Sequence, residues 1–174
     1  ITIGNVSDDA AVLAKYGAAK IVNIANEGAF NNGAFASLIN QVAEQHGANL
    51  YVVSATNNGK MLAPALAVQA NAALITNANA LPESTSPLTV QRTVFSSKGV
   101  AMFKSESVKT VITIVPNSVG VAEVAGPGTI SAASVTADGS LRTFAVEKVD
   151  RISGKIPLPE AELVVSAGRG MKAP

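Results

Sequence analysis

The stretch LYVVSATNNGKMLAPALAVQANAALIT, residues 50–76, decides the fold of this chain. Its first five residues, LYVVS, are mostly apolar and favour extended structure, which predicts a buried strand. Thr56 or Asn57 then caps an alanine-rich helix that ends near Ala70, and residues 72–76 are apolar enough to form the next strand. A strand, a helix and a strand in this order predict a right-handed crossover in a parallel sheet.

The same alternation continues on the N-terminal side of this stretch. Residues 1–4 read as the remnant of a strand, and the acidic pair Asp8 and Asp9 begins a short helix that Gly17 ends. The next two elements are a strand and an amphipathic helix, at residues 20–24 and 35–46.

On the C-terminal side the pattern changes to antiparallel structure and then returns to a buried strand. Period-two alternation predicts a hairpin made by residues 88–95 and 99–104. Residues 110–115 are wholly β-branched and mostly apolar, which is typical of a strand covered on both faces. Two further strands are expected at residues 142–149 and 163–166. The whole pattern predicts an α/β fold of three layers, with a mainly parallel sheet and an antiparallel hairpin excursion.

Composition excludes several kinds of function. The 174 residues are 48% hydrophobic and 14% charged, enough to bury the core of one domain. A net charge of +1 with scattered lysines and arginines disfavours nucleic acid and anionic membranes as partners. One histidine and no cysteine supply neither a metal site nor a catalytic triad. The apolar runs are shorter than the roughly 20 residues that cross a bilayer, so the chain is not membrane-spanning.

The most informative candidate site is the cationic glycine loop, Ala167-Gly168-Arg169-Gly170, that follows the last expected strand. Backbone N–H groups and a guanidinium placed after a strand can bind phosphate or flavin groups at the carboxyl edge of an open α/β sheet. The structural alternative is that the glycines only provide positive φ for a turn.

Other polar groups have structural interpretations that outweigh functional ones. His46 falls at a helix C-terminus, where a positive charge complements the helix dipole. Asp8 and Asp9 are adjacent, so they do not share a helix face, and capping explains them better than acid–base catalysis. The run Asn57-Asn58-Gly59-Lys60 before a helix is a weak anion cradle, because it lacks the second glycine and the Lys-Ser/Thr pair of a P-loop.

Two separated segments resemble one family. VVSAGRGMKAP, residues 164–174, is similar to the signature of the electron-transfer flavoprotein alpha subunit, a strand followed by Ser-Gly-Gly-Arg-Gly, a hydrophobic residue and lysine; here Ala167 replaces the first glycine. SATNNGKMLAPALA, residues 54–67, is similar to that family's Ala-Thr-x-x-Gly-Lys/Arg segment. Residues 92–95 and 98–101 also fall where the family has comparable residues, so the resemblance covers nearly the whole chain.

The resemblance implies a Rossmann-like domain of the adenine nucleotide alpha hydrolase-like kind. Residues 1–165 would be the N-terminal domain, apparently without its first strand–helix unit. Residues 166–174 would be a hinge into a FAD-binding domain that is absent from this chain. By the same resemblance Arg169 contacts FAD, with Gly168 and Gly170 beside it, and the chain has no catalytic and no metal-binding residue.

The function implied by the resemblance is electron transfer. The alpha subunit would form a heterodimer with a beta subunit, take electrons from acyl-CoA or other flavoprotein dehydrogenases of fatty acid beta-oxidation, and pass them through FAD to a membrane quinone reductase. The cationic hairpin residues Arg92, Lys98 and Lys104 would be a solvated face or would touch the beta subunit. The compartment would be the bacterial cytoplasm, or else the mitochondrial matrix.

Two alternatives of other classes remain open. A nucleotide-binding module of the universal-stress type has a similar fold, but it would need a glycine-rich loop for ATP and leaves the loop at residues 167–172 unexplained. A small hydrolase is disfavoured by the shortage of a nucleophile and a base.

Overall fold

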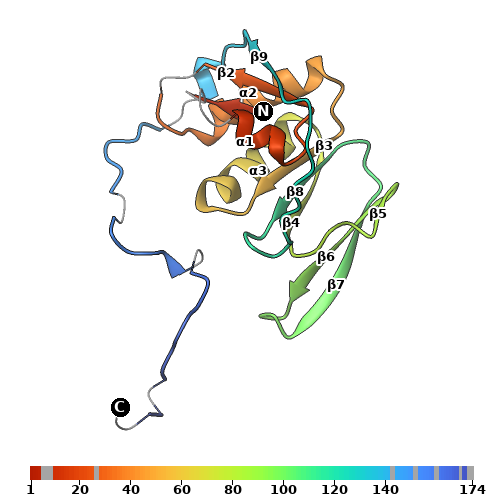
Figure 1. The fold of residues 1–174 in the computed structure, drawn as a ribbon. Coiled ribbons are helices and arrows are strands. Elements are labelled where there is room, and N and C mark those ends of the chain that lie inside the picture. Colours follow the sequence, from red (N-terminus) through yellow and green to blue (C-terminus); the bar gives the residue numbers. More distant parts are fainter. Residues whose placement is uncertain are drawn as a thin grey trace.

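The chain has a packed body and a long C-terminal segment that runs away from it (Figure 1). The computed structural model describes residues 1–4, 10–25, 28–141, 144–150, 153–158, 161–168 and 170–171. All helices and strands of the described residues lie within the body, which ends at a short 3₁₀ helix, Gly139–Leu141.

The described elements alternate between strands and helices up to β4, as the sequence predicts. In chain order they are β1 (Thr2–Ile3), α1 (Ala10–Lys15), β2 (Lys20–Ile24), α2 (Asn32–Gln45), β3 (Leu50–Ser54), α3 (Asn57–Gln69), β4 (Ala73–Ala78), β5 (Ser84–Thr85), β6 (Leu88–Val94), β7 (Gly99–Ser105), β8 (Thr110–Ile114) and β9 (Thr129–Ala133). The expected α/β class is confirmed.

The strands are arranged in two sheets. One has six strands in the order β3-β8-β4-β6-β5, with β7 paired to β6, and the other has three in the order β1-β2-β9. Pairs of β8 with β3 and β4, and of β2 with β1 and β9, are parallel. The β6–β7 hairpin and its contact with β4 are antiparallel. The mainly parallel sheet with a hairpin excursion is therefore also confirmed.

Strand β8 lies between β3 and β4 in the larger sheet, and its β-branched residues pack on both faces. Val111 belongs to a core cluster with Leu66 of α3 and Tyr51 of β3. Ile112, the next residue, points the opposite way and packs with Ile75 and other apolar side chains of β4 and β6. The prediction of a strand covered on both faces is correct.

The long helices are positioned by caps and by two apolar faces. Thr56 caps α3, its side chain accepting a hydrogen bond from the backbone N–H of Gly59 at 3.2 Å. In α2, Leu38 and Val42 pack against β2, while Ala36 and Ala43 join the cluster shared with α3. Helix α2 therefore connects the two sheets.

Two expected strands are wrong and one real strand was not expected. Strands were expected at residues 142–149 and 163–166, but residues 144–149 and 163–166 form none, and residues 142 and 143 lie outside the described residues. Alternation gives a segment two faces, but a strand also needs a neighbouring strand for its backbone, and no described strand pairs with these residues. Strand β9 was not predicted from the sequence, yet it pairs with β2 from Lys20↔Thr129 to Ile24↔Ala133.

Candidate functional site

The glycine loop lies near the end of the C-terminal segment and is exposed. The backbone N–H of Met171 donates to the carbonyl oxygen of Gly168 at 3.1 Å, so the chain turns here. Arg169, the predicted anion-binding side chain, lies outside the described residues. Because residues 163–166 form no strand, the expected delivery of this loop to a sheet edge is not seen.

The need for glycine at position 168 is not explained by the turn alone. A Cβ at Gly168 would meet nothing within 4 Å, and the residue does not adopt a positive φ. Neither backbone strain nor packing within the described chain therefore excludes a side chain at this position. Gly170 also has open space around it. The loop is free to approach a group that is not part of this chain.

The weak anion cradle at the start of α3 has a structural explanation. A Cβ at Gly59 would lie 1.8 Å from the carbonyl oxygen of Ser54, so only glycine allows the first turn of α3 to approach the end of β3. Asn57, Asn58 and Lys60 are exposed around it. The glycine therefore serves helix–strand packing, which explains it without a bound anion.

The three cations of the hairpin have different surroundings. Lys98 is exposed in the turn, and Lys104 forms an exposed ion pair with Glu106 at 2.8 Å. Arg92 is half-buried, with its guanidinium 4.9 Å from the ring centroid of Phe103, so its assignment to a solvated face is wrong. Alternation along the strand could have indicated this, because Arg92 shares a face with Val90 of the core.

The exposed apolar residues of the hairpin do not form one patch. The cross-strand pairs Thr93↔Val100 and Gln91↔Met102 put Val100 and Met102 on the outer face, 62% and 43% exposed. Val94 lies on the opposite face, beside Arg92 in the alternation. Phe95 sits in the turn itself and is 83% exposed.

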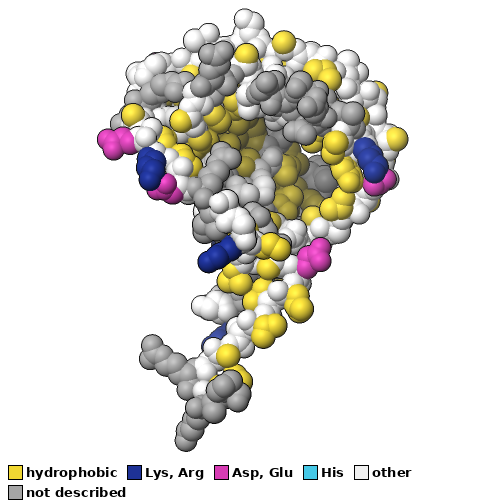
Figure 2. Space-filling model, turned by 60° about the vertical axis from the view of Figure 1, so that its left-hand side comes forward, with side chains coloured by type: hydrophobic (Ala, Val, Ile, Leu, Met, Phe, Trp, Pro, Cys, Tyr) yellow, Lys and Arg dark blue, Asp and Glu magenta, His cyan; other side chains and the backbone are white. Residues whose placement is uncertain are grey.

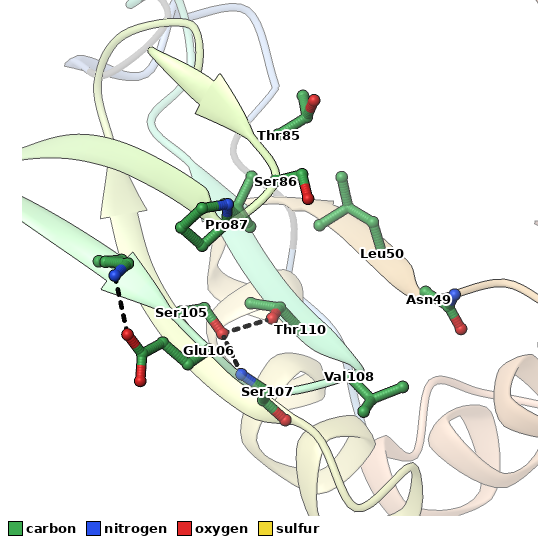
Figure 3. Close-up of a pocket in the computed structure, with 12 residues that line it drawn as sticks. Asn49, Leu50, Thr85, Ser86, Pro87, Ser105, Glu106, Ser107, Val108 and Thr110 are labelled. Atoms are coloured by element: carbon green, nitrogen blue, oxygen red, sulfur yellow. Dashed lines mark hydrogen bonds and ion pairs between the residues drawn. The ribbon is translucent and has the colours of Figure 1, made fainter.

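A cavity of about 670 Å³ lies at the end of the larger sheet where β3 and β8 begin (Figure 3). It is bordered by the first residues of β3, β6 and β8 and by the turn after β7. Its hydroxyl pair, Ser105 and Thr110, is already satisfied by a 2.7 Å hydrogen bond, and Lys104 is paired with Glu106. Open α/β sheets hold ligands at the carboxyl ends of their strands, and this cavity is at the amino ends. It is a poor candidate for a ligand site.

The remaining candidates keep structural roles or cannot be placed. His46 is the C-cap of α2 and its backbone N–H bonds to Val42 and Ala43. Asp8 and Asp9 lie outside the described residues. Within the described part of the chain, no three His, Asp or Glu side chains are grouped so that they could hold a metal ion. No described helix has the length and apolar character needed to cross a membrane.

Topology and hairpin together define a Rossmann-like α/β domain. Comparison with known proteins adds the family, because residues 1–138 match the family described as "Electron transfer flavoprotein domain". The chain belongs to the electron transfer flavoprotein family.

Two curated relatives are similar over most of the chain. The electron transfer flavoprotein subunit alpha of Syntrophomonas wolfei is 28% identical over 164 residues, covering 92% of this chain and 52% of that protein. The subunit alpha of Bacillus subtilis strain 168 is 27% identical over 173 residues, covering 97% of this chain and 53% of that protein. The resemblance to the alpha subunit is confirmed, and the chain spans about half the length of these relatives.

Proposed function

We propose that this chain is the N-terminal scaffold of an electron transfer flavoprotein alpha subunit, an electron carrier and not a substrate-transforming enzyme. The observation that carries the proposal is the C-terminal segment. It leaves a body that matches the family, exposes apolar side chains, and ends in the glycine loop. Leu163 and Val165, just before the loop, are 82% and 90% exposed. Apolar side chains gathered on a projecting segment favour contact with a further domain or chain.

Figure 2 supports this interpretation from another side of the molecule. Hydrophobic side chains surround a hollow in the body and continue along the segment that leaves it, whereas charged side chains are few on this face. A surface of this character suits burial against protein rather than binding of a strongly charged ligand. We therefore assign the body to positioning and subunit contact.

The flavin would be held in part by the glycine loop. FAD, when bound, provides the redox chemistry of an electron carrier. Gly168 and Gly170 leave room for backbone N–H groups to approach it, and the guanidinium of Arg169 is a permanent charge with planar donors suited to an anionic group of the cofactor. These residues fit one wall of a cofactor site, and the other walls would come from outside this chain.

The partners follow from the same proposal. A beta subunit would complete a heterodimer and contact the hairpin through Phe95, Val100 and Met102, which are exposed. Acyl-CoA or other flavoprotein dehydrogenases would donate electrons, and a membrane quinone reductase would accept them. Both relatives come from bacteria, which favours the bacterial cytoplasm over the mitochondrial matrix.

The test is to express the full gene product with the beta subunit and to follow its flavin absorbance. We expect stoichiometric FAD, bleaching by an acyl-CoA dehydrogenase with its substrate, and recovery on addition of a quinone reductase. A purified complex without flavin, or a flavin that no dehydrogenase reduces, would contradict the proposal.

A further inference from the structure

The body holds the side chain of Arg92 in place, but none of the described residues forms an ion pair with it. It lies on β6, opposite Ala101 of β7 and next to Ala78 of β4. Its Nη1 donates to the hydroxyl of Thr76 at 3.1 Å, and its guanidinium lies over the ring of Phe103. A hydrogen bond and a stacked ring hold the plane of the guanidinium in one orientation.

This guanidinium lacks an acceptor for one of its donors. The Nε of Arg92 is buried and makes no hydrogen bond. None of the ion pairs found among the described residues includes Arg92. Because Nε is buried, only the Nη groups of Arg92 could meet a group from outside the chain. A half-buried charge without a counter-charge costs free energy, and the described residues leave the charge of Arg92 uncompensated.

The position of Arg92 indicates the kind of group that completes it. The turn end of the hairpin projects from the body (Figure 1), so a second protein chain can contact it there, whereas Val90 on the face of Arg92 packs into the core. Beyond Phe103, the face of Arg92 continues with the small residue Ala101, and Val94 and Phe95 cover Gly99 at the end of the hairpin.

A carboxylate fits this position better than a phosphate. The planar guanidinium matches the two oxygens of a carboxylate, whereas phosphate sites usually combine several donors such as a helix N-terminus or further cations. The other hairpin cations do not provide such a set: Lys104 alternates onto the outer face of β7 and is paired with Glu106.

We infer that Arg92 binds a carboxylate of the beta subunit and anchors the hairpin in the heterodimer. This inference rests on the proposed function, because it takes the second chain from there. Such a contact would give Arg92 the counter-charge that no described residue of this chain provides, and it would fix the register of the hairpin against its partner.

The experiment measures the dissociation constant of the alpha–beta complex, prepared from the full-length subunits, for three alpha variants. Arg92→Gln should weaken the complex about tenfold or more, since loss of one member of a buried ion pair is costly. Arg92→Lys keeps the charge but not the planar donors and should lose less. Lys98→Gln removes an exposed cation from the same hairpin and should change the constant less than about twofold.

The thermal midpoint of the isolated alpha subunit separates this role from a structural one. If the charge of Arg92 is compensated only in the complex, Arg92→Gln should leave the thermal midpoint of the isolated subunit unchanged or raise it. A lower midpoint together with an unchanged dissociation constant would show that Arg92 serves only the contacts with Thr76 and Phe103, and would overturn the inference. If Arg92→Gln does not fold, the inference stands on Arg92→Lys, and binding equal to wild type in that variant would overturn it.

Two further outcomes are decisive. Loss of FAD without any change in subunit affinity would identify the anion as a phosphate of the cofactor and would overturn the inference. A wild-type alpha subunit that binds no second chain would overturn the proposed function and this inference together, whereas a wild-type complex that Arg92→Gln leaves intact would overturn this inference alone.

Discussion

Arg169 is the residue on which the cofactor proposal can be tested most directly. In the full-length protein, Arg169→Ala should weaken FAD retention about tenfold or more if the guanidinium contacts the pyrophosphate, because a hydrogen bond to a charged group contributes roughly 1.5–3 kcal/mol. If it faces the isoalloxazine instead, affinity should change little and the reduction potential should fall. Fluorescence titration and potentiometry distinguish these results.

Matched variants make the Arg169 experiment specific. Arg169→Lys should restore part of either effect, because the charge remains while the planar donors are lost. Lys155→Ala removes an exposed cation of the same C-terminal segment and should have no effect. Unchanged affinity and potential in Arg169→Ala would leave the glycine loop as a turn without a cofactor role.

Tyr51 makes the stability of the body sensitive to alkaline pH. Burial raises the pKa of Tyr51 above its ordinary value of 10.0, although nearby Lys109 opposes this shift. Its hydroxyl donates to Asn40 at 3.1 Å. The folded state therefore keeps a proton that the unfolded chain releases, so this contribution is complete below about pH 10 and is lost as the pH rises towards the folded-state pKa.

The prediction is that urea midpoints fall between about pH 9 and 11 and that Tyr51→Phe reduces this fall. Only part of the fall should disappear, because the hydrogen bond to Glu44 also raises the pKa of Lys109, and its contribution is lost in the same direction. An identical alkaline slope in wild type and Tyr51→Phe would contradict the assignment to Tyr51.

At the scale of elements, the approach of α3 to β3 depends on one glycine. Gly59→Ala would place a Cβ 1.8 Å from the backbone oxygen of Ser54. Helix propensity alone would favour alanine by up to about 1 kcal/mol, so the sign of the effect is informative. We expect a loss of about 2 kcal/mol or more in the free energy of unfolding, measured with urea.

A second glycine offers the control for this substitution. Gly139 has no neighbour within 4 Å of a built Cβ, and its φ is not positive. Gly139→Ala should leave the free energy of unfolding within about 0.5 kcal/mol of wild type. Equal stability of the two variants would mean that α3 can move away from β3 at little cost.

The elements that the sequence predicts well have two independent signals. Strand β8 consists of β-branched residues, and α3 begins at a capping residue, Thr56. In both cases residues that favour turns mark the two ends of the element as a second signal. Strand β9, TISAA, has small and exposed residues, and its existence depends on pairing with β2, which local sequence does not encode. Residues 163–166 show the opposite case: they are mostly apolar, which favours a strand, but no strand lies beside them to pair with their backbone.

The candidate site was predictable to a similar degree. The glycine loop was found because its composition is unusual, but the place of its partner groups depends on structure outside the segment. The half-buried position of Arg92 was not predicted because its charge suggested solvent, whereas the register of the hairpin places it on the face of Val90 and Phe103. Strand alternation and tertiary packing determine how far a charged side chain is buried, and the residue type alone does not predict this.

At the scale of the whole molecule, the length of the relatives indicates a longer polypeptide. Helix α2 packs against both sheets and holds the described body together. The matched relatives are about twice as long as this chain. We propose that the native polypeptide has a length similar to that of these relatives, and an intact mass near 17.6 kDa would contradict this.

The last prediction concerns binding by this chain on its own. Cofactor sites usually bury 70–90% or more of a ligand of this kind, and the loop at Gly168 offers one exposed turn at the end of an extended segment. Equilibrium dialysis should therefore detect tight binding of neither FAD nor ATP to residues 1–174, whereas the full-length complex should retain FAD. Stoichiometric retention of ATP would instead favour a nucleotide-binding module. Retention of FAD by this chain alone would mean that most of the flavin site lies within it, which would move the site from the proposed second domain into the body described here.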